Sequence, residues 1–360
     1  MDSAHFTAVD SPEARAFDEI QEGSRRARSR SGPRRLQIAL AGGTVAVEVS
    51  GAALFDRITP ALAHLTPAGG SRDDSEPDLT VALWDADEGG MVGPPPAPGS
   101  DPTGRAQVSA SADGRFVLQR RTHAVIAQDR ARGAVVGWFR DVDRLPLYDR
   151  GRPLHPQLLL WNQDRGAPPL HAGLVALAGR GALLVGEGGS GKTTSALTCL
   201  LHGFDFLGDD YVSLLEDERG GFVGHGVYSS THVDPDHLAH FPELRARAVD
   251  PFWENEDKAV VFLADVFPKR LARKSPIDAL FLPTVRSGPT RVTPASPAEA
   301  GLRLVQGALA LAPHAGAGRV EALFALAAAV PAFRIDLGEN LAEIPAAVAR
   351  TLDALPARRR

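Results

Sequence analysis

The chain has 360 residues, of which 44% are hydrophobic and 23% charged, and its formal net charge is −5. These values are typical of a soluble globular protein, and they give no case for nucleic acid or an anionic membrane as a partner. A single cysteine, Cys199, excludes an internal disulfide framework and fits a reducing compartment. The sequence has no apolar run of about eighteen residues and no apolar signal segment, so we expect a cytoplasmic protein without a membrane span.

The first 35 residues are polar, and their second half is rich in arginine. Six arginines stand among Ser, Gly and Pro in this stretch: Arg25, Arg26, Arg28, Arg30, Arg34 and Arg35. Such a segment buries too little apolar surface to offset its ordering entropy, so we predict a disordered tail over residues 1–35. A basic arm for an acidic peptide or nucleic acid is the open alternative.

Residues 36–153 are predicted to form a small β-rich α+β domain. Short alternating or β-branched runs, which are typical of strands, occur at 36–40, 44–49, 79–84, 116–120, 122–127 and 134–139. One short helix is expected over 55–65, and two Gly/Pro-rich linkers over 66–77 and 86–104 are expected to be surface loops. We find no catalytic constellation in this part of the sequence.

The second predicted domain, residues 154–360, is organised around a glycine-rich loop with the spacing G-x-x-x-x-G-K-[ST]. An apolar, strand-like run precedes the loop at 182–185, and a helix-like run follows it at 194–201. Strand, loop and helix are the context that a phosphate-binding loop requires. The expected nucleotide-binding residues are Gly186, Glu187, Gly188, Gly189, Ser190, Gly191, Lys192, Thr193 and Thr194.

The residue types of this loop explain the expected chemistry. Glycines lack a Cβ atom, so successive backbone N–H groups can turn inward around phosphate oxygens. The N-terminus of the following helix adds unpaired amides and the positive end of its dipole. Lys192 is expected to reach the β- and γ-phosphates of ATP, and the Thr193 hydroxyl is expected to ligate Mg²⁺.

Strands and helices alternate around the loop, as expected for an α/β fold. Strands are predicted at 170–177, 204–207, 211–215, 222–228, 258–263, 277–282 and 333–337, with Pro283 ending the sixth. Helices are predicted to start near 156, to lie near 236–241, and to span 296–311, 319–330 and about 340–355. Residues 229–236, which include His232, are predicted to form a loop.

An acidic pair, Asp209-Asp210, follows the predicted strand 204–207. In a nucleotide-binding α/β sheet, ligands lie beyond the carboxyl ends of the strands, so we expect both carboxylates to face the phosphates. Phosphoryl transfer needs a carboxylate to hold Mg²⁺ and a base to take the proton of an acceptor hydroxyl. The pair supplies both groups on one turn.

Three motifs together resemble the nucleotide-binding domain of HPr kinase/phosphorylase, a family related to the ATP-dependent phosphoenolpyruvate carboxykinases. They are His171-Ala172-Gly173, the glycine-rich loop and Gly208-Asp209-Asp210. The offsets of His171 and Asp209 from Gly186 are those of that family. The pattern over 257–261 and the ending over 333–348 also look like the broader set of HPr kinase-like serine kinases, and the resemblance covers about 154–350.

The resemblance implies a P-loop domain of the HPr kinase/carboxykinase type, acting as an ATP- and Mg²⁺-dependent kinase on a Ser or Thr hydroxyl of a protein or peptide. Asp209 would be the base that deprotonates the acceptor, and Asp210 would be a Mg²⁺ ligand together with Thr193. His171 would be a polar group close to the transferred phosphate. Lys258 would neutralise charge on the transferred phosphoryl group, with an exposed strand-end lysine as the alternative.

The sequence also departs from true HPr kinases. Thr193-Thr194 replaces their Ser-Glu, and their arginine-glycine signature is missing between Tyr211 and Pro251, which argues against HPr itself as the substrate. Two other functions stay open: a nucleotide-dependent binding module that regulates the N-terminal domain, and a small-molecule kinase or carboxykinase-like enzyme. The family's hexameric habit suggests a homo-oligomer.

Overall fold

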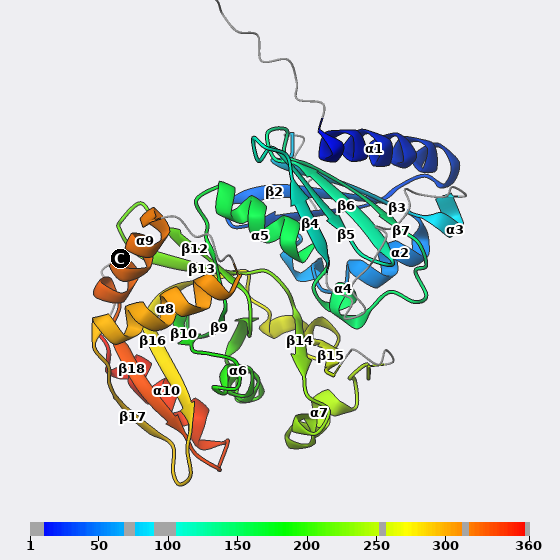
Figure 1. Ribbon diagram of the computed structural model, residues 1–360. Coiled ribbons are helices and arrows are strands. Elements are labelled where there is room, and N and C mark those ends of the chain that lie inside the picture. The colour runs from blue at the N-terminus through cyan, green and yellow to red at the C-terminus, as the bar shows by residue number, and fades with distance from the viewer. Residues whose placement is uncertain (1–10, 68–75, 90–105, 252–256, 312–316, 357–360) are drawn as a thin grey trace, which may run out of the picture. The chain divides into compact units, whose positions relative to one another are not determined.

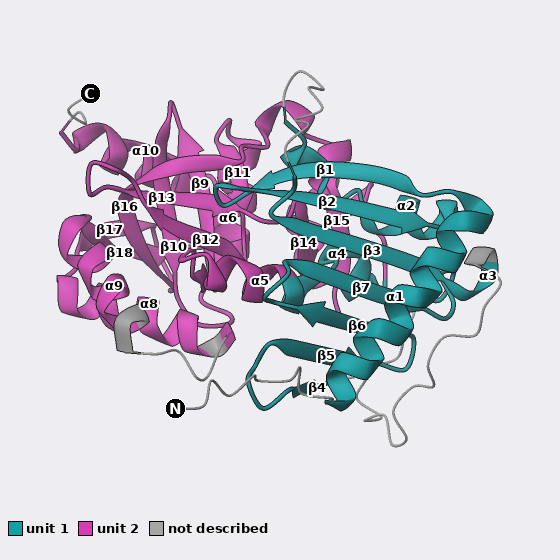
Figure 2. Cartoon of the chain, turned by 90° about the horizontal axis from the view of Figure 1, so that it is seen from above, with its two compact units in different colours: residues 1–157, 251–257 teal, residues 158–250, 258–360 magenta. Residues whose placement is uncertain are grey.

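The computed structural model describes residues 11–67, 76–89, 106–251, 257–311 and 317–356. The chain forms two compact units, shown in Figures 1 and 2. Unit 1 consists of Met1–Gln157 with Pro251–Asp257, and unit 2 consists of Leu158–Asp250 with Lys258–Arg360. Among the described helices, none combines the length and the apolar character that crossing a membrane requires.

Unit 1 is built on a seven-stranded mixed sheet of order β1-β2-β3-β7-β6-β5-β4. Its strands are β1 Arg34–Leu40, β2 Gly43–Ser50, β3 Leu79–Asp85, β4 Gln107–Ala110, β5 Phe116–Arg120, β6 Ala124–Asp129 and β7 Ala134–Phe139. The pairs β2–β3 and β3–β7 are parallel, and the others are antiparallel. All six predicted strands are confirmed to within two residues. Strand β4 was not predicted, because it is an exposed edge strand whose sequence lacks apolar alternation.

The prediction of a disordered tail is wrong for residues 12–31, which form helix α1 (Pro12–Ser31) across one face of the sheet (Figure 2), and for residues 34 and 35, which begin β1. Residues 1–10 lie outside the described part. The Ser11 side chain caps the helix by accepting a hydrogen bond from the Ala14 N–H at 3.1 Å. Phe17 and Ile20 are fully buried in one cluster with Trp84. The sheet therefore supplies the apolar partner that the polar composition of this segment did not indicate.

The remaining elements of unit 1 are short. The single helix predicted over 55–65 is two elements, α2 (Ala52–Ile58) and the 3₁₀ turn η1 (Ala63–Leu65). Helices α3 (Ala86–Gly89) and α4 (Leu147–Gly151) follow, and α5 (His155–Asp164) leads from unit 1 into unit 2. The predicted linkers 66–77 and 86–104 fall largely outside the described residues.

Unit 2 contains a nine-stranded mixed sheet with the main order β11-β9-β10-β16-β13-β12-β8, to which β18 adds beside β16, and β17 beside β18. Its strands are β8 Pro169–Leu170, β9 Ala172–Leu177, β10 Arg180–Val185, β11 Asp205–Gly208, β12 Val212–Glu216, β13 Phe222–Gly226, β16 Lys274–Val285, β17 Arg291–Pro294 and β18 Ala332–Leu337. Outside this sheet, β14 (Ser230–Val233) pairs with β15 (Ala259–Phe262).

Helices cover both faces of the unit 2 sheet and give it an α/β architecture. Helices α6 (Lys192–Leu201) and α10 (Glu343–Ala354) pack in one core cluster, and α8 (Pro297–Leu311) and α9 (Ala317–Ala329) pack in the other. Strand β10 contributes Ala182 and Leu184 to the first cluster and Leu183 and Val185 to the second. Its continuous apolar run is thus explained by burial on both faces.

Two details of unit 2 correct the predictions. Residues 230–233 form β14, whereas a loop was predicted over 229–236. Strand β16 continues past Pro283, which pairs with Ile335 of β18. The Leu280 N–H donates toward β18, and the N–H direction alternates along a strand, so the backbone nitrogen of residue 283 points to the β10 side. On that side the pairing of β16 with β10 ends at Phe281. The missing N–H of the proline therefore interrupts no ladder in the described sheet.

Short helical turns complete unit 2. They are η2 (His237–His240), α7 (Pro242–Arg245), η3 (Leu263–Asp265) and η4 (Pro268–Arg270). Helix α10 begins at Glu343, and Asn340 before it accepts a hydrogen bond from the Ala342 N–H at 3.2 Å.

Candidate active site

Strand directions bring the predicted motifs to one edge of the unit 2 sheet. Strand β9 is antiparallel to both β10 and β11, so β10 and β11 run in the same direction. Their carboxyl ends, at Val185 and Gly208, therefore lie at the same edge, and the glycine-rich loop and the acidic pair follow them. Val185 pairs with Ala172, so His171, immediately before β9, also lies at this edge.

The glycine-rich loop joins β10 to α6 and borders open space. Gly189 and Gly191 have φ angles of 77° and 96°, which glycine adopts without strain. A Cβ atom at Gly188 or Gly189 would meet no described heavy atom within 4 Å, whereas one at Gly191 would lie 2.3 Å from Leu337 Cδ1. The loop thus combines a backbone accessible to a ligand with a position that admits only glycine.

Lys192, the first residue of α6, is 4% exposed. Its Nζ donates hydrogen bonds to the carbonyl oxygens of Gly186, at 2.8 Å, and Glu187, at 2.9 Å. Burial lowers the pKa of Lys192, while the negative charges of Asp210 and Asp209 oppose this change and the positive charge of Lys258 adds to it. Both predicted carboxylates and Lys258 therefore lie within electrostatic reach of the ammonium group.

Asp209 is buried and receives a hydrogen bond from a residue that sequence reasoning missed. Its Oδ2 accepts from the Thr231 hydroxyl at 2.5 Å, and the two residues are 3% and 0% exposed. Thr231 belongs to β14 and pairs with Val261 of β15. The only sequence signal for it was a short polar run, Ser229 to His232, which was interpreted as a loop.

Asp210 contacts His171 rather than lying alone at the strand end. His171 Nε2 is 3.1 Å from Asp210 Oδ1. The His171 ring stacks on Tyr211, with centroids 6.1 Å apart, and Tyr211 meets Tyr228 edge to face. Stacking on Tyr211 orients the imidazole of His171, and its Nε2 in turn holds the carboxylate of Asp210.

The other predicted site residues differ in their surroundings. Thr193 is partly exposed at the first turn of α6, and the Thr194 hydroxyl is 3.0 Å from His237 Nε2. The Glu187 side chain is exposed and lies 3.5 Å from Arg303. The Ser190 Oγ is buried and has no hydrogen-bond partner among the described residues. Lys258 is exposed directly before β15.

The donor set of this edge fits ATP with magnesium. Across the described residues, no group of three or more His, Cys, Asp or Glu side chains could hold a metal ion by itself. Magnesium at phosphate sites typically uses one or two carboxylates together with substrate phosphates. Asp210 and the Thr193 hydroxyl offer such a set beside an open glycine-rich backbone, and the unsatisfied Ser190 Oγ adds a polar atom in the loop itself.

Comparisons with known proteins find matches among the solved structures. No family model matches the chain, and no curated protein matches it. One solved structure, the Hpr(Ser) kinase/phosphatase from Coxiella burnetii, is matched at 12% sequence identity and a TM-score of 0.28. The match covers 51% of this chain and 95% of that chain. A likeness at this level defines no activity.

Proposed function

We propose that the chain is an ATP- and Mg²⁺-dependent kinase that transfers the γ-phosphoryl group to a Ser or Thr hydroxyl of a protein or peptide. The observation that carries the proposal is the meeting of the glycine-rich loop, Lys192 and the pair Asp209-Asp210 at one sheet edge. The spacing of the three motifs, which resembles that of HPr kinase/phosphorylase, supports the same reaction.

The loop residues are suited to hold the nucleotide. Backbone amides of Gly186–Gly191 and the N-terminus of α6 would bind the phosphates, and Lys192 would exchange its two carbonyl partners for phosphate oxygens. Thr193 and Asp210 would hold Mg²⁺, which supplies charge neutralisation at the phosphates. His171, hydrogen-bonded to Asp210, keeps that carboxylate oriented.

Asp209 is suited to act as the base. In the transfer step the acceptor hydroxyl gives its proton to the Asp209 carboxylate while its oxygen forms a bond to the γ-phosphorus. The bond from the γ-phosphorus to the β–γ bridging oxygen breaks, and ADP leaves with that electron pair. Lys192 and Lys258 offset the negative charge on the transferred group.

The test is the transfer of labelled γ-phosphate from ATP to polypeptides of the protein's own cell extract, with and without Mg²⁺. The Asp209→Asn variant keeps the shape of the side chain but removes the base, so transfer should slow by about 100-fold or more while ATP still binds. Asp265→Asn, which changes an exposed carboxylate of η3, is the matched control and should behave as the wild type.

The outcomes separate the candidate functions. A polypeptide labelled by the wild type and by Asp265→Asn, but not by Asp209→Asn or without Mg²⁺, supports the kinase and identifies its substrate by mass. ATP binding without any labelled polypeptide would refute a protein or peptide kinase, and would favour a small-molecule kinase or a nucleotide-dependent binding module.

A further inference from the structure

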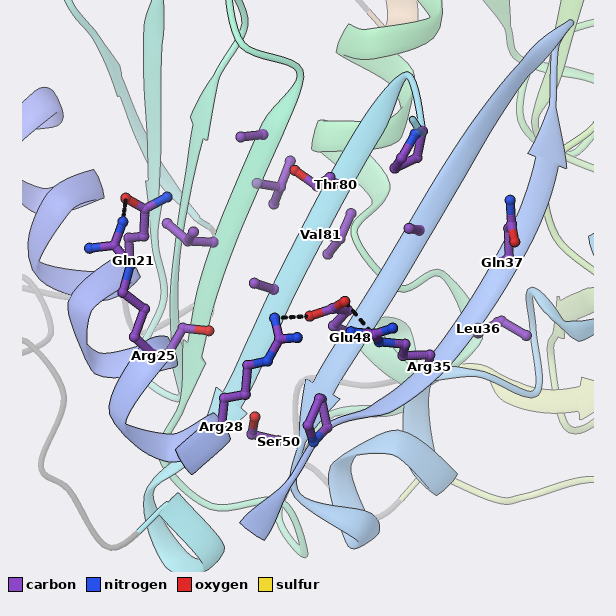
Figure 3. A pocket seen from close by; sticks show the side chains of 18 of the residues that line it. Gln21, Arg25, Arg28, Arg35, Leu36, Gln37, Glu48, Ser50, Thr80 and Val81 are labelled. Atoms are coloured by element: carbon purple, nitrogen blue, oxygen red, sulfur yellow. Dashed lines mark hydrogen bonds and ion pairs between the residues drawn. The ribbon is translucent and has the colours of Figure 1, made fainter. Parts of the chain in front are cut away.

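A groove opens on the sheet face of unit 1 beside helix α1. The helix packs against β7, β6, β5 and β3, and leaves part of the same face over β1, β2 and β3 uncovered. The groove has a volume of about 800 Å³ and is lined by residues of unit 1 (Figure 3). This volume lies within the range of about 300–1,000 Å³ that ligand pockets typically have.

The strands that line the groove contribute several short side chains. Ala46 of β2, Ala82 of β3 and Ala134 of β7 line it from neighbouring strands. Side chains alternate between the two faces of a sheet along each strand, and Ala82 and Ala134 also pack against the core cluster of α1, so these alanines lie on the face that α1 covers in part. Because these side chains are short, an extended segment can lie close to the backbone of the sheet.

The rim of the groove carries an excess of positive charge. Arg25 and Arg28 reach it from α1 and Arg35 reaches it from β1, and these are joined by one acidic lining residue, Glu48 (Figure 3). Glu48 contacts Arg28 at 2.8 Å and Arg35 at 2.9 Å, so two guanidinium groups share one carboxylate. The three arginine side chains are 51% to 68% exposed and therefore open to a partner.

We propose that this groove docks an acidic, extended segment of another polypeptide. Carboxylates of the segment would pair with Arg25 and share Arg28 and Arg35 with Glu48, and its backbone would lie over the three alanines. The described lining contains no aromatic residue on which bases could stack, so single-stranded nucleic acid fits less well. Docking of such a segment does not depend on phosphoryl transfer. The further idea that the docked polypeptide is also the kinase substrate rests on the proposed function.

The test measures fluorescence anisotropy of a short labelled peptide rich in Asp and Glu, titrated with the full chain at low salt. The counterpart peptide has every Asp and Glu replaced by Asn and Gln, and a labelled single-stranded oligonucleotide is the third probe. Arg25→Glu and Arg35→Glu should each weaken binding of the acidic peptide by about tenfold, because a favourable charge becomes a repulsive one. Added salt should weaken it further.

The chain offers a matched control and a variant with the opposite effect. Arg26→Glu makes the same charge change on the same helix. Like Arg25, Arg26 contacts Glu22, but it does not line the groove. This variant should weaken binding of the acidic peptide by less than about twofold. Glu48→Gln removes the competing carboxylate and should strengthen binding several-fold. Circular dichroism checks that each variant is folded.

The results decide the proposal in either direction. The proposal is supported if the chain prefers the acidic peptide and if Arg25→Glu and Arg35→Glu weaken its binding. Arg26→Glu should then bind the peptide nearly as the wild type does, and Glu48→Gln should bind it more tightly. Equal binding of the two peptides, equal loss in Arg26→Glu, or tighter binding of the oligonucleotide would overturn it. Lys192→Met, which removes the proposed ATP contact, should bind the peptide as the wild type does, so failure of docking is distinguishable from failure of the kinase.

Discussion

The carboxylate of Asp209 and the hydroxyl of Thr231 lie 2.5 Å apart, in a hydrogen bond between two buried residues that are 22 positions apart in the sequence. Thr231 is held in place by the pairing of β14 with β15, and Asp209 follows the end of β11. A hydrogen bond to an ionised carboxylate is among the stronger ones in a protein interior. Under the proposed function, Thr231 is therefore a positioning residue for the base.

Replacing Thr231 by Val keeps the side-chain shape but removes the donor. We expect kcat for phosphoryl transfer to fall by about 10- to 100-fold, because a misoriented base loses part of its catalytic contribution, while KM for ATP stays within about threefold. Steady-state kinetics give both constants. Thr231→Ser restores the hydroxyl and should recover most of kcat, and an unchanged kcat in Thr231→Val would show that the hydrogen bond is only structural.

Lys192→Met tests the proposed contact between Lys192 and the phosphates of ATP. The variant preserves the apolar stem and removes the ammonium group that the loop holds, so we expect the affinity for ATP to fall by about 100-fold or more. Isothermal titration calorimetry measures it directly. The control is Lys269→Met, at an exposed lysine of η4, which should bind ATP normally. If wild type and Lys192→Met bind ATP with equal affinity, Lys192 does not contact the nucleotide.

Gly23→Ala tests how tightly α1 is seated on its sheet. Alanine favours a helix interior over glycine by about 1 kcal/mol, but its Cβ would lie 2.4 Å from Cζ2 of the buried Trp84 ring. Overpacking a core costs about 1–3 kcal/mol, so the net effect should be destabilising. Urea unfolding followed by tryptophan fluorescence measures this change. Ser29→Ala, at an exposed position of the same helix, should not destabilise, and a more stable Gly23→Ala would contradict the packing.

His225 should make the stability of the chain sensitive to acid. Burial, assisted by the positive charge of Lys274, lowers the pKa of His225 from its usual 6.5 to about 4. Between these values the unfolded state binds a proton that the folded state does not, so the free energy of unfolding falls as pH drops from 6.5 to 4. Each pH unit corresponds to at most about 1.4 kcal/mol, and partial exposure reduces this.

The measurement compares wild type and His225→Gln by urea unfolding across that pH window. The variant cannot take up the proton, so its stability relative to wild type should improve toward acid, by about 2 kcal/mol over the window. His240→Gln changes an exposed histidine and should leave the pH dependence as in the wild type. Parallel pH profiles of wild type and His225→Gln would disprove the assignment.

Local patterns in the sequence were sufficient for much of this fold. The glycine-rich loop was predicted together with its strand and helix, because glycine spacing and apolar runs act within a few residues. Six strands of unit 1 followed from short alternating or β-branched runs, which are typical of strands. The resemblance to HPr kinase/phosphorylase, carried by the offsets of His171 and Asp209 from Gly186, implied that these residues belong to one site.

Only the tertiary structure decided the features that depend on distant partners. Helix α1 was mistaken for a disordered tail because its few apolar residues, such as Phe17 and Ile20, are stabilised by a sheet formed from later residues. The same packing turns an arginine-rich segment into the rim of a groove. Thr231 was hidden because a hydroxyl acquires its role only when β14 brings it to Asp209. Sequence spacing thus determined the local glycine-rich loop, whereas burial and strand pairing between remote segments determined what surrounds it.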